Sequence, residues 1–231
     1  MIHTREWCAV EETARAANYP LSRWYLRPAA GSLATALAET RARPSHLTIL
    51  GMLTAVAAGA SLVTQPHGSI LAAALVLAAW FFDRADGQLA RRQRTTSARG
   101  AWLDANIDEL VDVGLHIAAA QAAAMATGSD WPWMALVAFL VGKYLFMYGL
   151  AEEDRFADQA RTRGSFRAAP SGLLKRLYHL PANADVRIHL LAAAAATGWL
   201  AAELALVAAY YNFRWLARYV LVCRRLSGEA P

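Results

Sequence analysis

Long, mostly apolar stretches alternate along the chain with short polar or basic segments. A helix that crosses a bilayer needs about 20 predominantly apolar residues, and several stretches reach this length if an occasional polar residue is accepted. The pattern predicts six transmembrane helices, near residues 46–64, 69–92, 101–127, 131–152, 184–199 and 201–224. Charged residues lie at one end of the second and third helices, and the last two share a tight turn near Gly198.

Lysine and arginine gather in every second connecting segment. Six arginines precede the first apolar stretch, four lie within 91–99, six basic residues lie within 155–176, and two follow the last stretch. The segments at 65–69 and 127–131 and the turn near Gly198 contain neither residue type. Basic residues that flank membrane spans accumulate on the cytoplasmic side. The alternation therefore predicts six spans with both termini in the cytoplasm.

Residues 1–45 differ from the rest of the chain because they lack a continuous apolar stretch. They are predicted to form a cytoplasmic segment ahead of a membrane domain at 46–231. Within this segment, 21–40 mixes aromatic, leucine and arginine residues in a way that suits an amphipathic helix lying in the headgroup region. A helix packed on the protein's own loops fits equally well, and 170–180 has the same amphipathic character. The predicted fold class is an all-α integral membrane protein with an N-terminal interfacial helix.

Composition supports a membrane class and argues against two others. Hydrophobic residues make up 57% of the chain, above the roughly 45–50% of soluble domains. The net charge of +5 would indicate nucleic-acid binding only if the basic residues clustered on a recognisable module, so no nucleic-acid partner is expected. Cys8 and Cys223 are far apart and fit no metal-ligand spacing, which argues against a disulfide framework or a zinc site.

Five aspartates lie between residues 83 and 112, where the second predicted helix ends and the third begins. Ionisable residues inside membrane helices are costly and usually mark function. Helix positions i, i+3, i+4 and i+7 share one face. One stripe of the second helix therefore carries two carboxylates followed by two very small residues: Asp83, Asp86, Gly87 and Ala90.

The third predicted helix carries a matching stripe with a spacing of four residues. Its members are Gly100, Asp104, Asp108 and Asp112. The small residue again lies on the side nearest the connecting loop. If the two helices fold back on each other as a hairpin, we expect the two stripes to converge near the cytoplasmic interface.

Converging carboxylates require a source of positive charge. Four of them in a low dielectric cannot all stay ionised without compensation, and a divalent metal is the simplest source. Hard oxygen ligands select magnesium, calcium or manganese, and magnesium favours a few carboxylates together with phosphate oxygens of a substrate. We therefore predict a metal site formed by Asp83, Asp86, Asp104 and Asp108.

This interpretation also explains the small residues on the two stripes. Gly87, Ala90 and Gly100 would let a bulky nucleotide approach the helix backbones closely, and Arg91 could supply charge to a phosphate. The structural alternative is a surface salt-bridge network between the aspartates and nearby arginines. The arginines available for it are Arg84, Arg91, Arg92, Arg94 and Arg99.

This segment resembles the signature of the CDP-alcohol phosphotransferases, D-x2-D-G-x2-A-R-x8-G-x3-D-x3-D. All eight fixed positions over 26 residues match, which makes the resemblance specific: Asp83, Asp86, Gly87, Ala90, Arg91, Gly100, Asp104 and Asp108. Residues 43–53, RPSHLTILGML, are also similar to the family's usual entry into its first helix.

The resemblance implies that an acceptor hydroxyl attacks the β-phosphorus of a CDP-linked donor and releases CMP. The four aspartates would hold one or two Mg²⁺ or Mn²⁺ ions against the pyrophosphate, and Asp108 would also accept the hydroxyl proton. The nucleotide-binding side would comprise Asp86, Gly87, Ala90, Arg91 and Gly100. The active site would face the cytoplasm at the cell membrane, and a homodimer is expected because dimers are common in chains resembling this family.

The signature leaves the substrates open among glycerol phosphate, inositol phosphate, serine, choline and ethanolamine. Ala105 stands where serine-transferring relatives would carry a serine, which disfavours that acceptor. The main hypothesis is transfer of a phosphatidyl group from a lipid such as CDP-diacylglycerol to a small alcohol or polyol phosphate. The alternative is transfer from CDP-choline or CDP-ethanolamine to a lipid alcohol. A metal or solute transporter is a remote alternative, because transporters usually hold charge near the bilayer midplane.

A phosphorylated acceptor needs cationic groups near the metals. Lys143 in the fourth predicted span and Arg214 and Arg218 in the sixth are candidates for acceptor binding. Each of these long side chains could instead reach the membrane interface or pair with Asp112 or Glu109.

Overall fold

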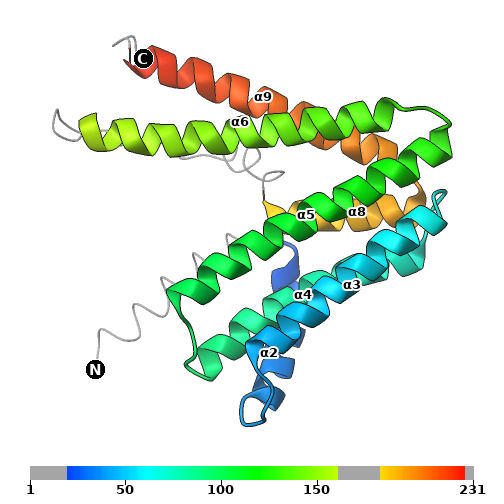
Figure 1. Cartoon of the computed structure of the whole chain (residues 1–231), viewed down its shortest axis with the longest axis vertical. Helices are drawn as coiled ribbons and strands as arrows, with labels where there is room; N and C mark the ends of the chain where they lie inside the picture. Colours follow the sequence, from blue (N-terminus) through cyan, green and yellow to red (C-terminus); the bar gives the residue numbers. More distant parts are fainter. Residues whose placement is uncertain (1–19, 161–182, 227–231) are drawn as a thin grey trace.

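The computed structural model describes residues 20–160 and 183–226, with side chains for 20–152 and 183–224. These residues fold into seven α-helices and one 3-10 helix, and contain no strand (Figure 1). The elements are η1 (Ser22–Trp24), α2 (Leu26–Leu37), α3 (Pro44–Thr64), α4 (Ile70–Arg92), α5 (Ala98–Thr127), α6 (Trp131–Ala160), α8 (Ala184–Thr197) and α9 (Leu200–Leu226).

The six apolar stretches of the sequence correspond to α3, α4, α5, α6, α8 and α9. Most bounds agree with the predicted ones within three residues. The fourth predicted span matches the apolar part of α6, and the helix itself continues to Ala160 through the polar run after Leu150. The amphipathic segment predicted at 170–180 lies outside the described residues.

Three helical segments are long and apolar enough to cross a membrane: Pro44–Thr64, Ala98–Thr127 and Trp131–Glu152. They support a membrane protein by length and composition. Among the other described helices, α8 has only 14 residues, and α4 and α9 carry several charged residues each. Six spans with cytoplasmic termini therefore stay a prediction.

Local signals in the sequence explain the hairpin of α4 and α5. The side chain of Ser69 caps the start of α4 by accepting from the backbone N–H of Ala72, and Ser97 caps α5 by accepting from Gly100. A serine at this position satisfies one of the amide groups that a helix start leaves unpaired. Because α4 ends at Arg92 and α5 starts at Ala98, the connection is short. The two aspartate-bearing helix ends are therefore neighbours.

The helices pack through small side chains. Helix α3 packs against α4 and α5, α8 packs against α4, and α6 runs alongside α9 (Figure 1). In α5 the buried face is an alanine run that includes Ala119, Ala120, Ala122 and Ala123. Small residues let helix backbones approach closely, which is the usual source of helix association within a membrane.

The turn before α4 touches the turn after α8, at the end of the bundle opposite the aspartates. The Ser69 amide donates to the carbonyl oxygen of Ala195 at 2.7 Å. Gly198 has a φ of 77°, and a Cβ added there would lie 2.3 Å from the carbonyl oxygen of His67. Only glycine fits such a left-handed position against a neighbouring backbone.

A buried carboxylate fastens the N-terminal part of the structure to the bundle. Asp185 of α8 accepts from the backbone N–H groups of Leu21 at 2.7 Å and Ser22 at 2.9 Å, and from the Ser22 hydroxyl. It also accepts from Nε1 of Trp80 in α4 at 3.1 Å. This cluster ties η1, α4 and α8 together.

Helix α2 confirms the predicted amphipathic helix within 21–40. Its buried residues Ala30 and Ala34 pack with Ala85 and Leu89 of α4, whereas Trp24 just before it is 75% exposed. One face of α2 thus covers the protein itself, as in the packed alternative. Its location in the headgroup region stays a prediction.

Candidate active site

Three of the aspartates converge as the helical stripes predicted. Asp83 of α4 and Asp104 and Asp108 of α5 offer carboxylate oxygens that all lie within 4.8 Å of one another. The hairpin of α4 and α5 brings them together, because the chain reverses its direction between Asp83 and Asp104. Asp108 keeps 41% of its side chain exposed, so the group is open to a ligand.

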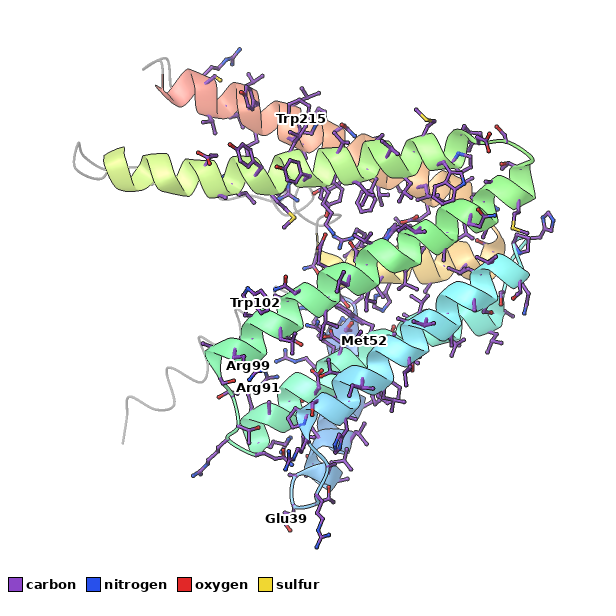
Figure 2. The ribbon with its side chains drawn as sticks, viewed as in Figure 1. Glu39, Met52, Arg91, Arg99, Trp102 and Trp215 are labelled. Carbon is purple, nitrogen blue, oxygen red and sulfur yellow. The ribbon has the colours of Figure 1, made fainter. Side chains whose placement is uncertain are left out.

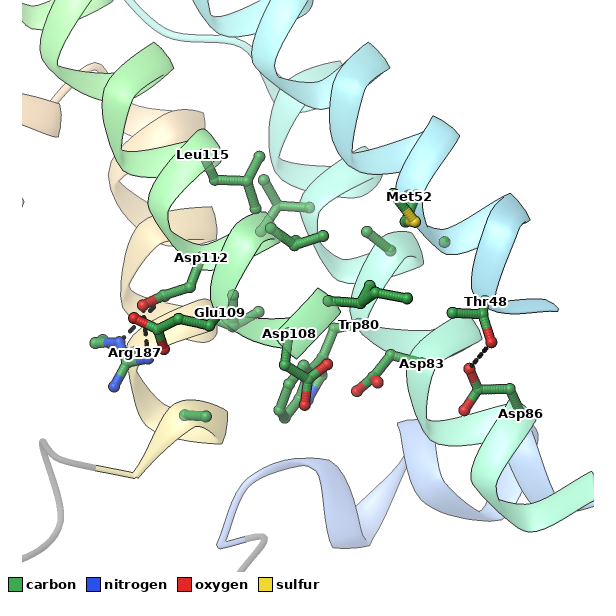
Figure 3. A pocket seen from close by; sticks show the side chains of 17 residues that line it. Thr48, Met52, Trp80, Asp83, Asp86, Asp108, Glu109, Asp112, Leu115 and Arg187 are labelled. Atoms are coloured by element: carbon green, nitrogen blue, oxygen red, sulfur yellow. Dashed lines mark hydrogen bonds and ion pairs between the residues drawn. The ribbon is translucent and has the colours of Figure 1, made fainter. Parts of the chain in front are cut away.

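Asp86 does not join this group in the structure. Its side chain is buried and accepts a hydrogen bond from the Thr48 hydroxyl of α3 at 2.6 Å. Figure 3 shows Asp86 directed toward Thr48, while Asp83 and Asp108 lie near each other. Thr48 was not singled out from the sequence. Nothing in its own spacing marks it, because it meets Asp86 only through the packing of α3 on α4.

The three converging carboxylates fit a hard divalent cation. All the donors are oxygens, which favours magnesium or manganese over softer metals. Magnesium usually keeps several positions for water or phosphate oxygens. A set of three protein carboxylates would leave such positions for a substrate.

One arginine neutralises part of the negative charge. Arg84 forms an ion pair with Asp83, and its Nη2 lies 3.6 Å from Oδ2 of Asp108. Its guanidinium stacks on the Trp80 ring, 4.0 Å from the ring centroid. The salt-bridge network that was the structural alternative therefore exists in part. It is formed by Arg84, at a position that the family signature leaves variable. Arg84 and Arg91 both act electrostatically on Asp104, and two cations among three carboxylates still leave an excess of negative charge.

A cavity of about 260 Å³ lies beside the carboxylates, between the first turn of α3 and the adjoining ends of α4 and α5. Arg91 and Arg99 lie at those adjoining ends (Figure 2). All five residues predicted for the nucleotide-binding side line this cavity, and so does Asp104: Asp86, Gly87, Ala90, Arg91 and Gly100. The geometry is that of a cleft with small side chains on both walls.

A second cavity, of about 150 Å³, continues from the first into the bundle. The two share the lining residues Thr48, Asp86 and Ile107. Figure 3 shows Asp83 and Asp108 on one side of this second cavity and Arg187 of α8 at its far end. We call it the central cavity.

The sequence pattern that defines the CDP-alcohol phosphatidyltransferases matches residues 41–223, which is most of the chain. The chain belongs to the CDP-alcohol phosphatidyltransferase family. By family the protein is therefore a transferase, in agreement with the resemblance found in the sequence.

A bifunctional IPC transferase and DIPP synthase from Aquifex aeolicus (strain VF5) is a similar curated protein. The two sequences are 27% identical over 183 residues, which is 79% of this chain and 39% of the relative. The chain thus spans less than half the length of the curated relative that it matches.

Deeper in the bundle, the transferase holds its fifth aspartate in a buried ionic network. Asp112 contacts Nζ of Lys143 in α6 at 2.5 Å and Nη2 of Arg187 in α8 at 2.9 Å. Lys143 also lies 2.7 Å from Glu109, and Arg187 donates to the Tyr211 hydroxyl at 2.7 Å. Three helices besides α5 are joined by these contacts.

The same network extends to α9 through a buried histidine. His116 donates from Nδ1 to the backbone oxygen of Asp112 at 2.7 Å. Its Nε2 lies 3.4 Å from Oε1 of Glu203. Both side chains are almost fully buried, so they bind α5 to α9 within the bundle rather than facing a substrate.

The three predicted acceptor-binding residues lie apart from the carboxylate group. Lys143 contacts Asp112 in the buried network. Arg214 donates to the Tyr210 hydroxyl at 2.7 Å and stacks on Phe146, and Arg218 also lies over Phe146. The residues that line the central cavity include none of the three and instead include Arg187, which the sequence analysis did not single out.

Proposed function

We propose that this transferase moves a phosphatidyl or related phospho-group from a CDP-linked lipid, such as CDP-diacylglycerol, to a small alcohol and releases CMP. The observation that carries the proposal is the group of Asp83, Asp104 and Asp108 at the junction of two cavities. One cavity has the walls expected around a nucleotide. The other leads to a cationic residue, Arg187, within the bundle.

In the proposed reaction the acceptor oxygen forms a bond to the β-phosphorus of the donor. The bond from that phosphorus to the bridging oxygen breaks, and the bridging oxygen leaves with CMP. Asp108 takes the acceptor proton, because its carboxylate lines the central cavity and is partly open to solvent. A bound divalent ion would neutralise the pyrophosphate and stabilise the departing CMP.

The remaining site residues have binding roles in this proposal. Asp83, Asp104 and Asp108 hold the metal, and Asp86, which lines both cavities, serves the metal and the nucleotide. The small residues of the nucleotide cleft allow close approach to the helix backbones. Arg91, at the end of that cleft, supplies positive charge to a phosphate.

We propose an anionic acceptor, such as glycerol phosphate or inositol phosphate. Arg187 lines the central cavity on the side away from the nucleotide cleft. Asp112 contacts both Arg187 and Lys143, and Lys143 also contacts Glu109. Asp112 and Glu109 both line the cavity. A phosphate entering here would compete with these carboxylates for the two cations. Arg214 and Arg218 would act at longer range from α9.

The proposed topology has six spans, both termini in the cytoplasm and the active site facing the cytoplasm at the cell membrane, in a homodimer. Accessible tags test the orientation. Tags at residues 66 and 129 should be labelled from outside, and a tag at residue 95 only after the membrane is opened. Labelling of residue 95 from outside would overturn the orientation. Chemical cross-linking in intact membranes tests the dimer.

CMP release tests the proposed activity. The purified protein is incubated in lipid nanodiscs with CDP-diacylglycerol, Mg²⁺ and a panel of alcohols and polyol phosphates. The expected result is CMP release that depends on one anionic acceptor. No release with any acceptor, together with product formation from CDP-choline and diacylglycerol, would favour the alternative in which the lipid accepts the phospho-group.

A further inference from the structure

Arg84 forms an ion pair with its neighbour in sequence, which helix geometry alone does not favour. Its Nε donates to Oδ2 of Asp83 at 2.6 Å, and its Nη2 lies 3.6 Å from Oδ2 of Asp108. Consecutive residues on a helix point in different directions and do not face each other. The guanidinium therefore has to be turned back along α4 to reach the Asp83 carboxylate, and it needs a support in that position.

The indole ring of Trp80 supplies this support from one turn earlier in α4. Residues four apart on a helix are neighbours, and the guanidinium of Arg84 lies over the ring, 4.0 Å from its centroid. A cation over the face of an indole is attracted by the ring, most strongly where water is partly excluded. The side chain of Arg84 is only 16% exposed. The stacked arrangement is therefore favoured over one that extends into solvent.

The ring is itself fixed at its polar edge. Nε1 of Trp80 donates to the Ser22 hydroxyl at 2.9 Å and to Oδ1 of Asp185 at 3.1 Å. Trp80 is buried and lines the central cavity together with Asp83 and Asp108 (Figure 3). Rotation of the indole would leave its buried N–H without these acceptors, which is costly. The ring therefore keeps one face against Arg84.

We propose that Trp80 is a positioning residue for the carboxylate group, and that the cation it positions lowers the affinity of this group for a divalent ion. Held by Trp80, Arg84 offsets part of the negative charge of Asp83 and Asp108. A divalent ion then competes with an internal cation for the same oxygens. The inference rests on the metal-dependent reaction of the proposed function and adds two residues to it. The family signature fixes Asp83 and Asp86 but neither Trp80 nor Arg84.

The sign of the effect separates this role from a purely structural one. If Arg84 only braced the Asp83 carboxylate in a suitable orientation, loss of the arginine would weaken metal binding. If Arg84 offsets charge, its loss leaves the carboxylates more negative, and a divalent ion binds more tightly. Damage to the fold would not produce tighter binding.

Binding of Mn²⁺ to the protein in phosphatidylcholine nanodiscs measures this affinity without turnover. Free Mn²⁺ is followed by electron paramagnetic resonance during a titration in the absence of nucleotide. Arg84→Gln should bind Mn²⁺ about tenfold more tightly than wild type, because a unit charge close to the ion is lost in a partly hydrated site. Arg84→Lys keeps the charge and should stay within about threefold of wild type. The control, Arg92→Gln, removes the same charge from the exposed end of α4 and should keep the wild-type affinity.

A double-mutant cycle tests the link to Trp80. Trp80→Leu removes the ring, so Arg84 should turn toward solvent and Mn²⁺ binding should tighten by about threefold or more. In the Arg84→Gln background the same change should have no further effect, because no cation is left to position. Trp80→Phe keeps an aromatic face and should lie between wild type and Trp80→Leu. Trp215→Leu makes the matched change in α9, where Nε1 also donates a hydrogen bond, and should bind Mn²⁺ as wild type does.

Fluorinated tryptophans keep the test decisive even if Trp80→Leu does not fold. Fluorine atoms on the indole weaken the negative potential of its face, while the shape of the ring and its N–H donor are kept. With analogues of increasing fluorine content at position 80, Mn²⁺ binding should tighten step by step. An affinity that does not depend on fluorine content would mean that Trp80 does not act through its contact with Arg84, and would overturn the proposal.

The remaining outcomes separate this role from the proposed function. Mn²⁺ binding by Arg84→Gln that is equal to or weaker than that of wild type would overturn the role and leave the function in place. Additive effects of Trp80→Leu and Arg84→Gln would do the same. If the variants bind Mn²⁺ in the expected order but no donor releases CMP, the proposed reaction is wrong and the role of Trp80 stands. If neither wild type nor Arg84→Gln binds Mn²⁺, both are wrong.

Discussion

Helix α5 carries two aspartates one turn apart that have opposite environments. Asp108 is 41% exposed, lines the central cavity and has one cation, Arg84, at 3.6 Å. Asp112 is 7% exposed and is held by Lys143 and Arg187. The residue type and the helix are the same. The cations that neighbouring helices supply decide which carboxylate is available for chemistry.

The charge balance of the two regions differs accordingly. Around Asp108, three carboxylates converge beside Arg84 and Arg91. Around Asp112, Lys143 and Arg187 both lie at hydrogen-bond distance from its carboxylate. A buried ion pair is strongly destabilising to break, because one charge is left without compensation. The outer group therefore attracts a cation from solution, and the inner network holds helices together.

Of all the changes, metal removal should have the largest effect on activity, because only the outer carboxylates need a cation from solution. Excess chelator should abolish CMP release, because the outer carboxylates then lack the charge that lets pyrophosphate approach them. Added Mg²⁺ or Mn²⁺ should restore it. Full turnover in chelator would mean that the nearby arginines alone balance the outer group and that no metal is used.

Asp108→Asn should give the next largest effect. Asparagine keeps the size and one oxygen but cannot take a proton, so kcat should fall by about 10²–10⁴-fold, the usual loss on removing a general base. CDP binding, measured by calorimetry, should survive in part. The control is Asp130→Asn, which makes the same change at an exposed residue before α6. Loss of CDP binding without loss of kcat would contradict the assigned role.

Asp83→Asn and Asp86→Asn should separate the two carboxylates of α4. Asp83 belongs to the converging group, so its change should raise the Mg²⁺ concentration needed for half-maximal activity by at least roughly tenfold. Asp86→Asn should weaken CDP binding as well, because Asp86 lines the nucleotide cleft. Thr48→Val removes the hydroxyl that donates to Asp86 and should have a smaller effect. Equal Mg²⁺ dependence in wild type and Asp83→Asn would remove Asp83 from the metal site.

Asp112→Asn should have the smallest effect on turnover and the largest on stability. The change leaves Lys143 and Arg187 with reduced compensation, and breaking a buried ion pair typically costs roughly 3–5 kcal/mol. The unfolding temperature should fall, while kcat stays within about tenfold of wild type. If Asp112→Asn abolished turnover and Asp108→Asn left it nearly intact, the register of the catalytic stripe would be wrong.

Much of this site could be predicted because its information is local. The spacing of Asp104 and Asp108 follows from one helix, and the short connection after Arg92 brings Asp83 to them. The hydrophobic runs predicted the long helices for the same reason, because a run of apolar residues depends only on consecutive positions.

The rest depends on pairings between distant segments. Arg187 meets Asp112 across 75 positions of sequence, and no spacing rule connects them. Asp185 likewise meets Ser22 only through the fold. Thr48 meets Asp86 only because α3 packs on α4, so neither segment alone shows the contact.

The polar ties within the bundle also determine how stiffly each carboxylate is held. Helix α4 is bound to α8 at Ser69 and again at Trp80, about 16 Å farther along at 1.5 Å per residue. These two contacts restrain α4 from sliding or tilting against α8. Helix α5 is bound to α8 at Asp112. Beyond Trp80, α4 is also held by α2, which packs on Ala85 and Leu89, and by Thr48 of α3, which donates to Asp86.

The start of α5 has less cover, because Ala101, Trp102, Leu103 and Ala105 are exposed. Asp83 and Asp86 therefore stand on a helix that is supported on both sides of them, whereas Asp104 and Asp108 stand on a helix end with fewer contacts. The α4 carboxylates provide the fixed side of the site, and the α5 carboxylates provide the side that can adjust when a ligand arrives or departs.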